Sequence, residues 1–180
     1  MSKHQKETDI RFMRRALQLA KRGYGKVSPN PMVGAVLVSH HEIIGEGWHR
    51  KAGGPHAEVI AIRDAEKKGN TTHLSTLYVS LEPCSTTGRT PPCTDAIMQS
   101  SIQRVVIACE DPNPAHAGKG IKILEDEGIE VVTEVLRDKA RRLNQDFFHW
   151  ICQGRPRVTI KAAMTLDGKI APASGQPKWI

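Results

Sequence analysis

The sequence of 180 residues predicts an α/β protein, built as a three-layer α/β/α sandwich in which helices flank one mixed sheet of five strands. Two observations support this prediction. From residue 56 onwards, stretches with the apolar spacing of helices alternate with short apolar stretches that are typical of buried strands. Before them, two apolar stretches are separated only by a tight connection, which indicates two neighbouring strands.

The first elements are a helix and this pair of strands. Residues 9–22 carry apolar side chains at helical spacing, and Gly23 supplies a stop. Residues 32–40 and 42–49 are the two strands.

The remaining elements alternate along the chain. A glycine follows the second helix and prolines precede the third, as expected at helix ends. In order, they are a helix at 56–68, a strand at 75–82, a helix opening within 91–101, a strand at 104–110, a helix at 119–128, a strand at 129–135 and a helix at 136–152.

The length suits one domain with a short appendage. Residues 153–157, QGRPR, are typical of a linker, and the chain then begins another strand and stops. The remaining stretch is too short for a second core. We therefore expect one domain over residues 1–152, followed at 153–180 by a linker and the first strand of an incomplete second domain.

The composition, with 39% hydrophobic and 25% charged residues, is that of an ordinary soluble protein. No apolar run approaches the length of a membrane span, and the first residues lack the apolar centre of a secretory signal. We therefore expect a cytoplasmic protein. The formal net charge of +7 suits an anionic partner, such as a phosphorylated metabolite, a nucleic acid or a membrane surface.

The sequence has four cysteines, which in the cytoplasm favour metal or thiol chemistry over disulfides. Cys109 ends an apolar run and Cys152 ends a helical stretch, so we expect both to be small buried hydrophobic residues. Cys84 and Cys93 differ, because one follows a strand and the other begins a helix.

His56, Cys84 and Cys93 all fall at the ends of predicted elements, which can converge on one edge of an α/β sheet. Thiolate and imidazole are ligands that suit zinc. Three protein ligands leave a position for water in a catalytic site, whereas four close a structural site. The sequence therefore predicts a catalytic zinc (Zn2+) site at these three residues.

Glu58 lies two residues after His56, too near to join easily as a fourth ligand. Zinc lowers the pKa of bound water to roughly 7 in favourable sites, and a nearby carboxylate can then carry the proton to a leaving group. Zinc nucleobase deaminases share this His-x-Glu and Pro-Cys pattern, although eight residues rather than two separate the cysteines here. Structural alternatives remain open: a helix cap, core packing, or a closed site completed by Cys109 or His49.

Four stretches carry a resemblance: NPMVGAVLV, GEGWHRKAGGPHAEVIAI, LEPCSTTGRTPPCTDAI and DPNPAHAGKGIKILEDEGIEV. Together they resemble the deaminase domain of the bifunctional riboflavin-biosynthesis deaminase/reductase family, over residues 9–152. The long spacing between the cysteines is specific to this branch. The segments KAAMTLDGKIA, SG and KWI resemble the opening of the family's reductase domain.

The resemblance implies a cytidine-deaminase-like fold and a reaction. The substrate would be 2,5-diamino-6-(5-phosphoribosylamino)pyrimidin-4(3H)-one, and hydrolytic loss of its 2-amino group would give 5-amino-6-(5-phosphoribosylamino)uracil and ammonia. It implies that His56, Cys84 and Cys93 hold one zinc ion per chain, and that Glu58 shuttles protons.

In a complete relative, a reductase domain would also reduce the ribosyl group with NADPH. The resemblance places contacts to that cofactor near Ala163 and Trp179, and we expect no reductase activity from this chain alone. The expected partner is the small phosphorylated pyrimidine. We expect neither nucleic acid nor membrane, and association into a homo-oligomer remains open.

Four residues are expected to contact the substrate: Asn30, His49, Arg89 and Asn113. Arg89 lies in the loop between the two cysteines and is favoured for the phosphate, which needs cationic or amide partners. Asn30 is equally well explained as a turn residue between two prolines.

Two other functions stay open. One is a zinc deaminase that acts on another nucleobase, a nucleotide or tRNA, against which the long cysteine spacing speaks. The other is a zinc-stabilised module that binds RNA, against which the low aromatic content of 4% speaks.

Overall fold

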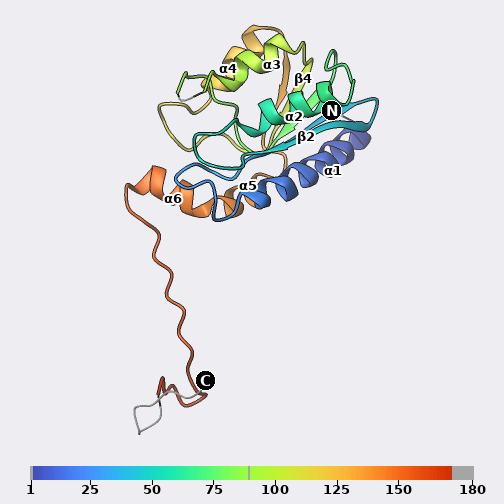
Figure 1. Ribbon diagram of the computed structural model, residues 1–180. Helices are drawn as coiled ribbons and strands as arrows, with labels where there is room; N and C mark the ends of the chain where they lie inside the picture. The colour runs from blue at the N-terminus through green and yellow to red at the C-terminus, as the bar shows by residue number, and fades with distance from the viewer. Residues whose placement is uncertain (1, 89, 172–180) are drawn as a thin grey trace.

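The computed structural model describes residues 2–88 and 90–171. Its centre is a five-stranded sheet with the strand order β2-β1-β3-β4-β5 (Figure 1). The strands are β1 (Gly34–Ser39), β2 (Glu42–Trp48), β3 (Thr76–Val79), β4 (Arg104–Ile107) and β5 (Glu130–Val132). β1 pairs antiparallel with β2 and β3, whereas β3, β4 and β5 are parallel. The mixed five-stranded sheet predicted from the sequence is confirmed.

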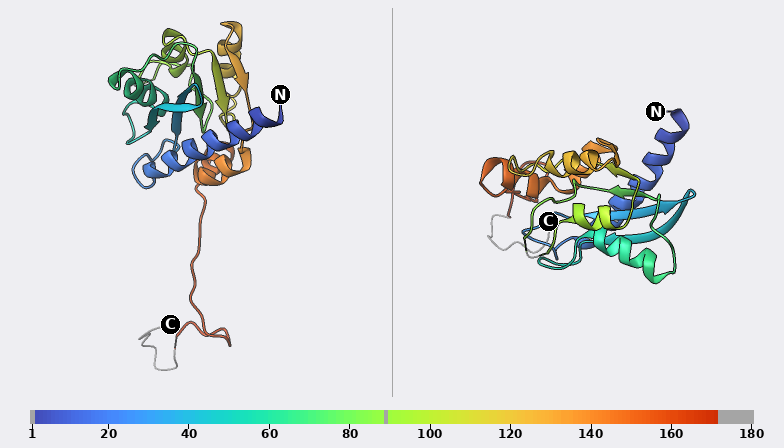
Figure 2. Two further views of the ribbon diagram at one scale, coloured as in Figure 1. Left: turned by 90° about the vertical axis from the view of Figure 1, so that its right-hand side faces the viewer. Right: turned by 90° about the horizontal axis from the view of Figure 1, so that it is seen from above.

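Helices cover both faces of this sheet, so the three-layer prediction is also confirmed. One face carries α2 (Ala57–Lys67), α3 (Cys93–Gln99) and α4 (Lys119–Asp126), and the other carries α1 (Lys3–Ala20), α5 (Arg137–Leu143) and α6 (Gln145–Gln153). Figure 2 shows α1 running obliquely across its face of the sheet.

The central strands are apolar on both faces because both are covered. Alternate side chains along a strand point to opposite sides. Leu37 and Val79 therefore join the core beneath α2 and α3, while Val36 and Tyr78 join the core beneath α1. All four side chains are at most 2% exposed.

The helix predicted over residues 9–22 begins earlier in the structure. α1 begins at Lys3, because the side chain of Ser2 accepts a hydrogen bond from Gln5 N at 3.2 Å and caps the helix. A 3-10 turn (Lys21–Gly23) follows α1.

The single helix predicted over 136–152 is wrong, since Asn144 divides it into α5 and α6. Asn144 Oδ1 accepts a bond from Met32 N at 2.8 Å, and its Nδ2 donates to Met32 O at 2.8 Å. This buried pairing with a distant backbone breaks the helical run.

The predicted strands extend past the observed ladders, mainly at their carboxyl ends. Residues 80–84 and 108–111 follow the ladders there, and Leu81, Glu82, Cys84 and Asp111 among them line the site described below. On the other side of β1, Gly47 lets α2 approach closely, because a Cβ at Gly47 would lie 2.2 Å from Ala57 O. This contact fixes the start of α2 against β2.

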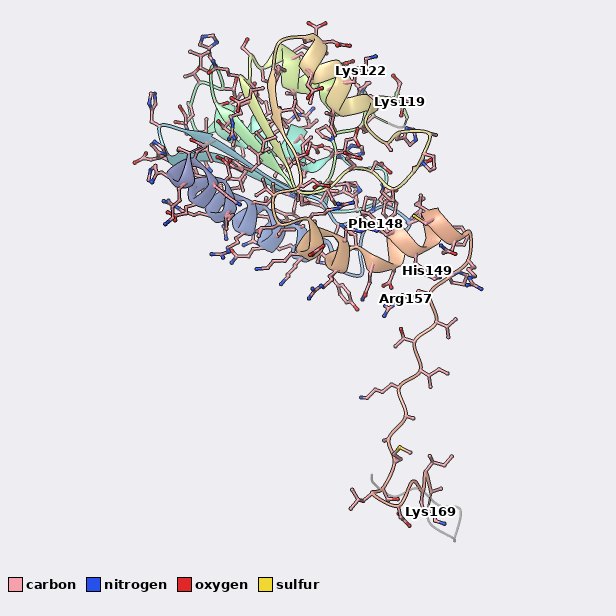
Figure 3. The ribbon with its side chains drawn as sticks, turned by 180° about the vertical axis from the view of Figure 1, so that it is seen from behind. Lys119, Lys122, Phe148, His149, Arg157 and Lys169 are labelled. Carbon is pink, nitrogen blue, oxygen red and sulfur yellow. The ribbon has the colours of Figure 1, made fainter. Side chains whose placement is uncertain are left out.

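The described tail, residues 154–171, contains no helix or strand, and its side chains are exposed. α6 ends at Gln153, and Gly154 follows it with a φ of 63°. Arg157 Nη1 pairs with Asp146 Oδ1 of α6 at 3.0 Å, and Figure 3 shows Lys169 well beyond this point, away from the sheet. The division into two domains stays a prediction. Within the described residues, no helix combines the length and the apolarity needed to cross a bilayer.

Candidate active site

His56, Cys84 and Cys93 come from three separate segments of the chain and lie close together. His56 is the N-cap of α2, Cys84 lies in the loop after β3, and Cys93 is the first residue of α3. Their candidate ligand atoms all lie within 4.8 Å of one another. His56 Nδ1 is 3.2 Å from Cys93 Sγ and 3.4 Å from Cys84 Sγ, so one ring nitrogen faces both sulfurs.

The backbone around the sulfurs favours negative charge. Cys93 N lies at the start of α3 and donates to Cys84 Sγ at 3.4 Å, and helix N-termini stabilise thiolates. A hydrogen bond from the Cys93 side chain lowers the pKa of Cys84 to about 4, against the effect of burial. The pKa of Cys93 is raised because the same bond holds its proton. Hydrogen bonding to Cys84 raises the pKa of His56.

This donor set fits zinc, since two sulfurs and one imidazole nitrogen are ligands that zinc prefers. Among the described residues, the group of candidate ligands consists of these three side chains. Cys109 lies elsewhere, with its Sγ 3.7 Å from Ser80 O, and His49 is engaged by other partners. Neither alternative fourth ligand therefore completes a closed site.

Glu58 lies in the first turn of α2 and is 3% exposed. Its Oε2 has no hydrogen-bond partner within the part of the chain that the structure describes, although buried polar atoms nearly always have one. Burial raises the pKa of Glu58 to about 7, although the charge of His56 opposes this. A carboxyl group in this state can both take up and release a proton near neutral pH.

These groups open into a cavity of about 320 Å3. Its lining includes His56, Glu58 and Cys84 together with residues of the β4–α4 segment. Phe147 and Ile151 of α6 contribute apolar side chains. The cavity therefore combines apolar surface with several polar groups, as expected of a small-molecule site.

Asn30 and His49 form one polar pair in this cavity. Asn30 Nδ2 donates to His49 Nε2 at 3.1 Å, and His49 Nδ1 donates to Pro55 O at 3.1 Å. Burial lowers the pKa of His49, which agrees with the neutral ring that these bonds require. The His49 ring also packs edge-on against His56, with 5.4 Å between the ring centroids.

The other residues predicted to bind ligands have different positions. Asn113 lines the cavity. Ala163 lies in the exposed tail and takes no part in the cavity. Arg89 and Trp179 lie outside the described residues. The expectation that Cys109 is buried is confirmed, but the same expectation for Cys152 is wrong, because α6 presents its far end to solvent there.

The residues that line the cavity and that sequence reasoning missed include Glu82, Asp111, His116 and Phe147. A usable signal existed for Asp111, which follows the carboxyl end of a parallel strand, where ligands bind in open α/β sheets. Phe147 carried no such signal, because its position depends on the break at Asn144.

Comparison with known proteins agrees with this geometry. The chain belongs to the family of the cytidine and deoxycytidylate deaminase zinc-binding region, whose model matches residues 6–109. Within that class, its relatives are riboflavin biosynthesis proteins. The RibD protein of Aquifex aeolicus is 53% identical over 175 residues, which are 97% of this chain and 48% of that protein.

Solved structures give the same result. The diaminohydroxyphosphoribosylaminopyrimidine deaminase/5-amino-6-(5-phosphoribosylamino)uracil reductase of Thermotoga maritima matches with a TM-score of 0.95 at 48% identity, over 98% of this chain and 50% of that one. RibD of Acinetobacter baumannii matches with a TM-score of 0.90 at 48% identity, over 97% and 48%. The resemblance and the cytidine-deaminase-like fold are thus confirmed, and the chain spans about half the length of the relatives it matches.

Proposed function

We propose that this chain catalyses the hydrolytic deamination of 2,5-diamino-6-(5-phosphoribosylamino)pyrimidin-4(3H)-one, a step of riboflavin biosynthesis. The observation that carries the proposal is a buried carboxylate oxygen of Glu58 that no described residue satisfies, next to a His-Cys-Cys group of which His56 and Cys84 line the same cavity as Glu58. The similarity to RibD proteins supports the choice of substrate.

His56, Cys84 and Cys93 would hold one zinc ion per chain. When bound, zinc supplies Lewis acidity, which lowers the pKa of a coordinated water. The chain contributes two thiolates and a neutral imidazole, whose charges balance that of the ion. It also leaves room for water, because the described residues offer three candidate ligands rather than four.

Glu58 would carry the protons of the reaction. Its carboxyl group would take one proton from the attacking water and pass it to the ring nitrogen. It would then take the second proton from the newly formed hydroxyl group as the C=O bond forms, and pass it to the amine, which leaves as ammonia when the C–N bond breaks. The first turn of α2 holds the side chain, and its burial shields both transfers from solvent. The unpartnered oxygen is the atom that a water molecule or a substrate amino group would meet.

Asn30, His49 and Asn113 would orient the pyrimidine. Because Nδ2 of Asn30 is engaged by His49, its side-chain oxygen is the atom that can accept a bond from a substrate amino group. Arg89 would bind the phosphate. The residues beside it support this assignment, since Gly88 and Thr90 line a second cavity of about 410 Å3 that also includes His56.

We further propose that the reaction takes place in the cytoplasm, where thiolates stay reduced. The small pyrimidine is the proposed partner, in preference to nucleic acid or membrane, and a homo-oligomer is compatible with this function. NADPH would serve only a reductase domain that contains the predicted contacts near Ala163 and Trp179.

Ammonia release tests the proposal. The purified chain should release ammonia from the pyrimidine ribonucleotide, lose this activity when a chelator removes the metal, and regain it when zinc is returned. Cytidine and deoxycytidylate should react far more slowly. A preference for either of these would support a deaminase of another class, and no release from any of the three would rule out the proposed function.

A further inference from the structure

Glu82 makes an unusual set of contacts next to the metal-ligand loop. It lies two residues before Cys84 and is 6% exposed. Its carboxylate accepts bonds from four backbone N–H groups of one distant segment. The bonds to Oε2 come from Asp111 at 3.0 Å and Gly118 at 3.1 Å, and those to Oε1 come from Gly120 at 3.0 Å and Ile121 at 3.4 Å.

The segment bound in this way runs from the connection between β4 and α4 into the first turn of α4. It carries Asp111, Asn113 and His116, which line the same cavity as Glu58 and Cys84. Short internal bonds shape the loop, such as that from Asn113 N to Asp111 Oδ1 at 2.8 Å. Glu82 adds direct bonds between both ends of this connection and the loop that carries Cys84.

The start of α4 is built around this carboxylate. The first N–H groups of a helix have no partner within the helix, and the N-cap residue Gly118 has no side chain to offer. Glu82 supplies the negative charge that a helix N-terminus favours. The approach is close, because a Cβ at Gly120 would lie 2.2 Å from Pro83 O.

We propose that Glu82 is a positioning residue that sets the spacing between the two walls of the cavity. It holds the Asp111–Ile121 connection against the Cys84 loop, so that Asn113 and His116 lie at a fixed distance from the proposed zinc ligands. Its two oxygens are engaged by backbone N–H groups, so it acts through these loops rather than on the substrate. The inference rests on the proposed function of this cavity.

Glu82→Gln tests this role. The amide has the same shape, but its NH2 group would face two N–H donors and lose two of the four bonds. In the zinc-loaded chain we expect faster hydrogen exchange across residues 111–121, with an unchanged ratio of zinc to protein. We also expect KM for the pyrimidine ribonucleotide to rise about 10-fold or more, while kcat changes much less, because misplaced binding groups weaken binding first.

Glu110→Gln is the matched control, because it makes the same chemical change at an exposed side chain of the same connection. It should leave hydrogen exchange and KM at their wild-type values. Glu82→Asp keeps the charge on a shorter side chain and should give intermediate changes. If Glu82→Gln does not fold, the hydrogen exchange and KM of Glu82→Asp test the proposal instead.

Unchanged exchange and KM in both Glu82 variants would overturn the proposal. So would a fall in kcat that only follows loss of zinc or of folded protein, with KM unchanged, because Glu82 would then be purely structural. If the wild type released no ammonia, the proposed function would fail together with the role of Glu82 in it. An active wild type with unaltered variants would remove the role of Glu82 alone.

Discussion

Two buried carboxylates, one near each end of the sheet, have opposite surroundings. Asp9 of α1 is 0% exposed and Glu58 of α2 is 3% exposed. Arg104 donates to both oxygens of Asp9 at 2.9 Å, and Tyr78 Oη and Gln5 Nε2 donate to Oδ1 at 3.0 and 3.1 Å. Glu58 instead has an oxygen that no described residue contacts through a hydrogen bond.

Their pKa values follow from these surroundings. Burial acts to raise both values. At Asp9 the hydrogen bonds and charge of Arg104 outweigh burial, and the pKa falls below its ordinary value. At Glu58 burial prevails, and the pKa rises to about 7. Burial alone therefore does not decide what a carboxylate does. A carboxylate with both oxygens hydrogen-bonded keeps its charge and ties elements together, whereas one with an oxygen that no described residue engages is available for proton transfer.

Glu58→Gln should give the largest effect. We expect kcat to fall about 1,000-fold, because general acid–base catalysis typically contributes this much. The bound zinc should be retained and the thermal midpoint should not fall, since Oε2 of Glu58 has no hydrogen-bond partner among the described residues and the amide keeps the shape of the side chain. Ammonia release, zinc analysis and thermal unfolding measure these three quantities. A variant that kept most of its activity would exclude Glu58 as the proton carrier.

Asp9→Asn should instead lower the stability of the fold and leave kcat nearly unchanged. It leaves the Arg104 guanidinium without its buried counter-charge, although Glu130 Oε1 still accepts from Arg104 Nε at 2.9 Å. We expect the free energy of unfolding to fall by about 3 kcal/mol, as when one partner of a buried ion pair is removed. Urea unfolding measures this loss, and kcat per folded molecule should stay near the wild-type value.

Arg137→Met is the control for Asp9→Asn. It removes a pair with Glu134 that is 2.7 Å long but about half exposed on both sides. Exposed pairs contribute roughly 0–1 kcal/mol, so the change should be small. If the two variants lost equal stability, burial of the Asp9 pair would not be the source of its strength.

The pH dependence of unfolding isolates the charge of Asp9. The pKa of Asp9 is lower in the folded state than in the unfolded chain, so the pair stabilises the fold above the unfolded pKa. This contribution is lost as the pH falls through the folded pKa. The stability difference between wild type and Asp9→Asn, measured in urea from neutral pH downwards, should therefore narrow below about pH 4. A constant difference would show that lost packing, rather than lost charge, explains the variant.

The sequence predicted that His56, Cys84 and Cys93 lie together, but not the Asp9 pair, for a physical reason. His56 and Cys93 lie at the starts of helices and Cys84 follows a strand, and the ends of elements can be located from patterns within a few residues. Asp9 looks like an ordinary polar residue near a helix start, because its partner Arg104 lies 95 residues away. Contacts between residues so far apart in the sequence form only when the folded sheet brings their segments together.

The same limit explains the error at residues 136–152. The apolar spacing there is helical throughout, and the break at Asn144 is caused by Met32, 112 residues away. Glu82 was missed because its four partners lie 29 to 39 residues further along the chain, in the β4–α4 connection and the first turn of α4. Local periodicity therefore predicts the layers of this fold, whereas the second wall of the cavity depends on pairings between distant segments.

Asn144→Ala should give a smaller effect than Glu58→Gln or Asp9→Asn. It tests whether the role of a buried polar side chain depends on its place in the fold or on how completely it is hydrogen-bonded. Asn144 is fully partnered, like Asp9, but it supports the segment beside Asn30, at the cavity end of the sheet. Losing both bonds to Met32 should lower the free energy of unfolding by about 2 kcal/mol. We also expect KM to rise about threefold, because Asn30 loses part of its support.

Asn70→Ala is the matched control for this change. Asn70 also bonds to a distant backbone, through Nδ2 to Ile44 O at 3.3 Å, but it lies outside the residues that line the cavity. It should cost about 1 kcal/mol and leave KM unchanged. If Asn144→Ala also left KM unchanged, Asn144 would affect only stability. A buried polar side chain with all its hydrogen bonds made would then have no effect on substrate binding, even when it lies beside the site.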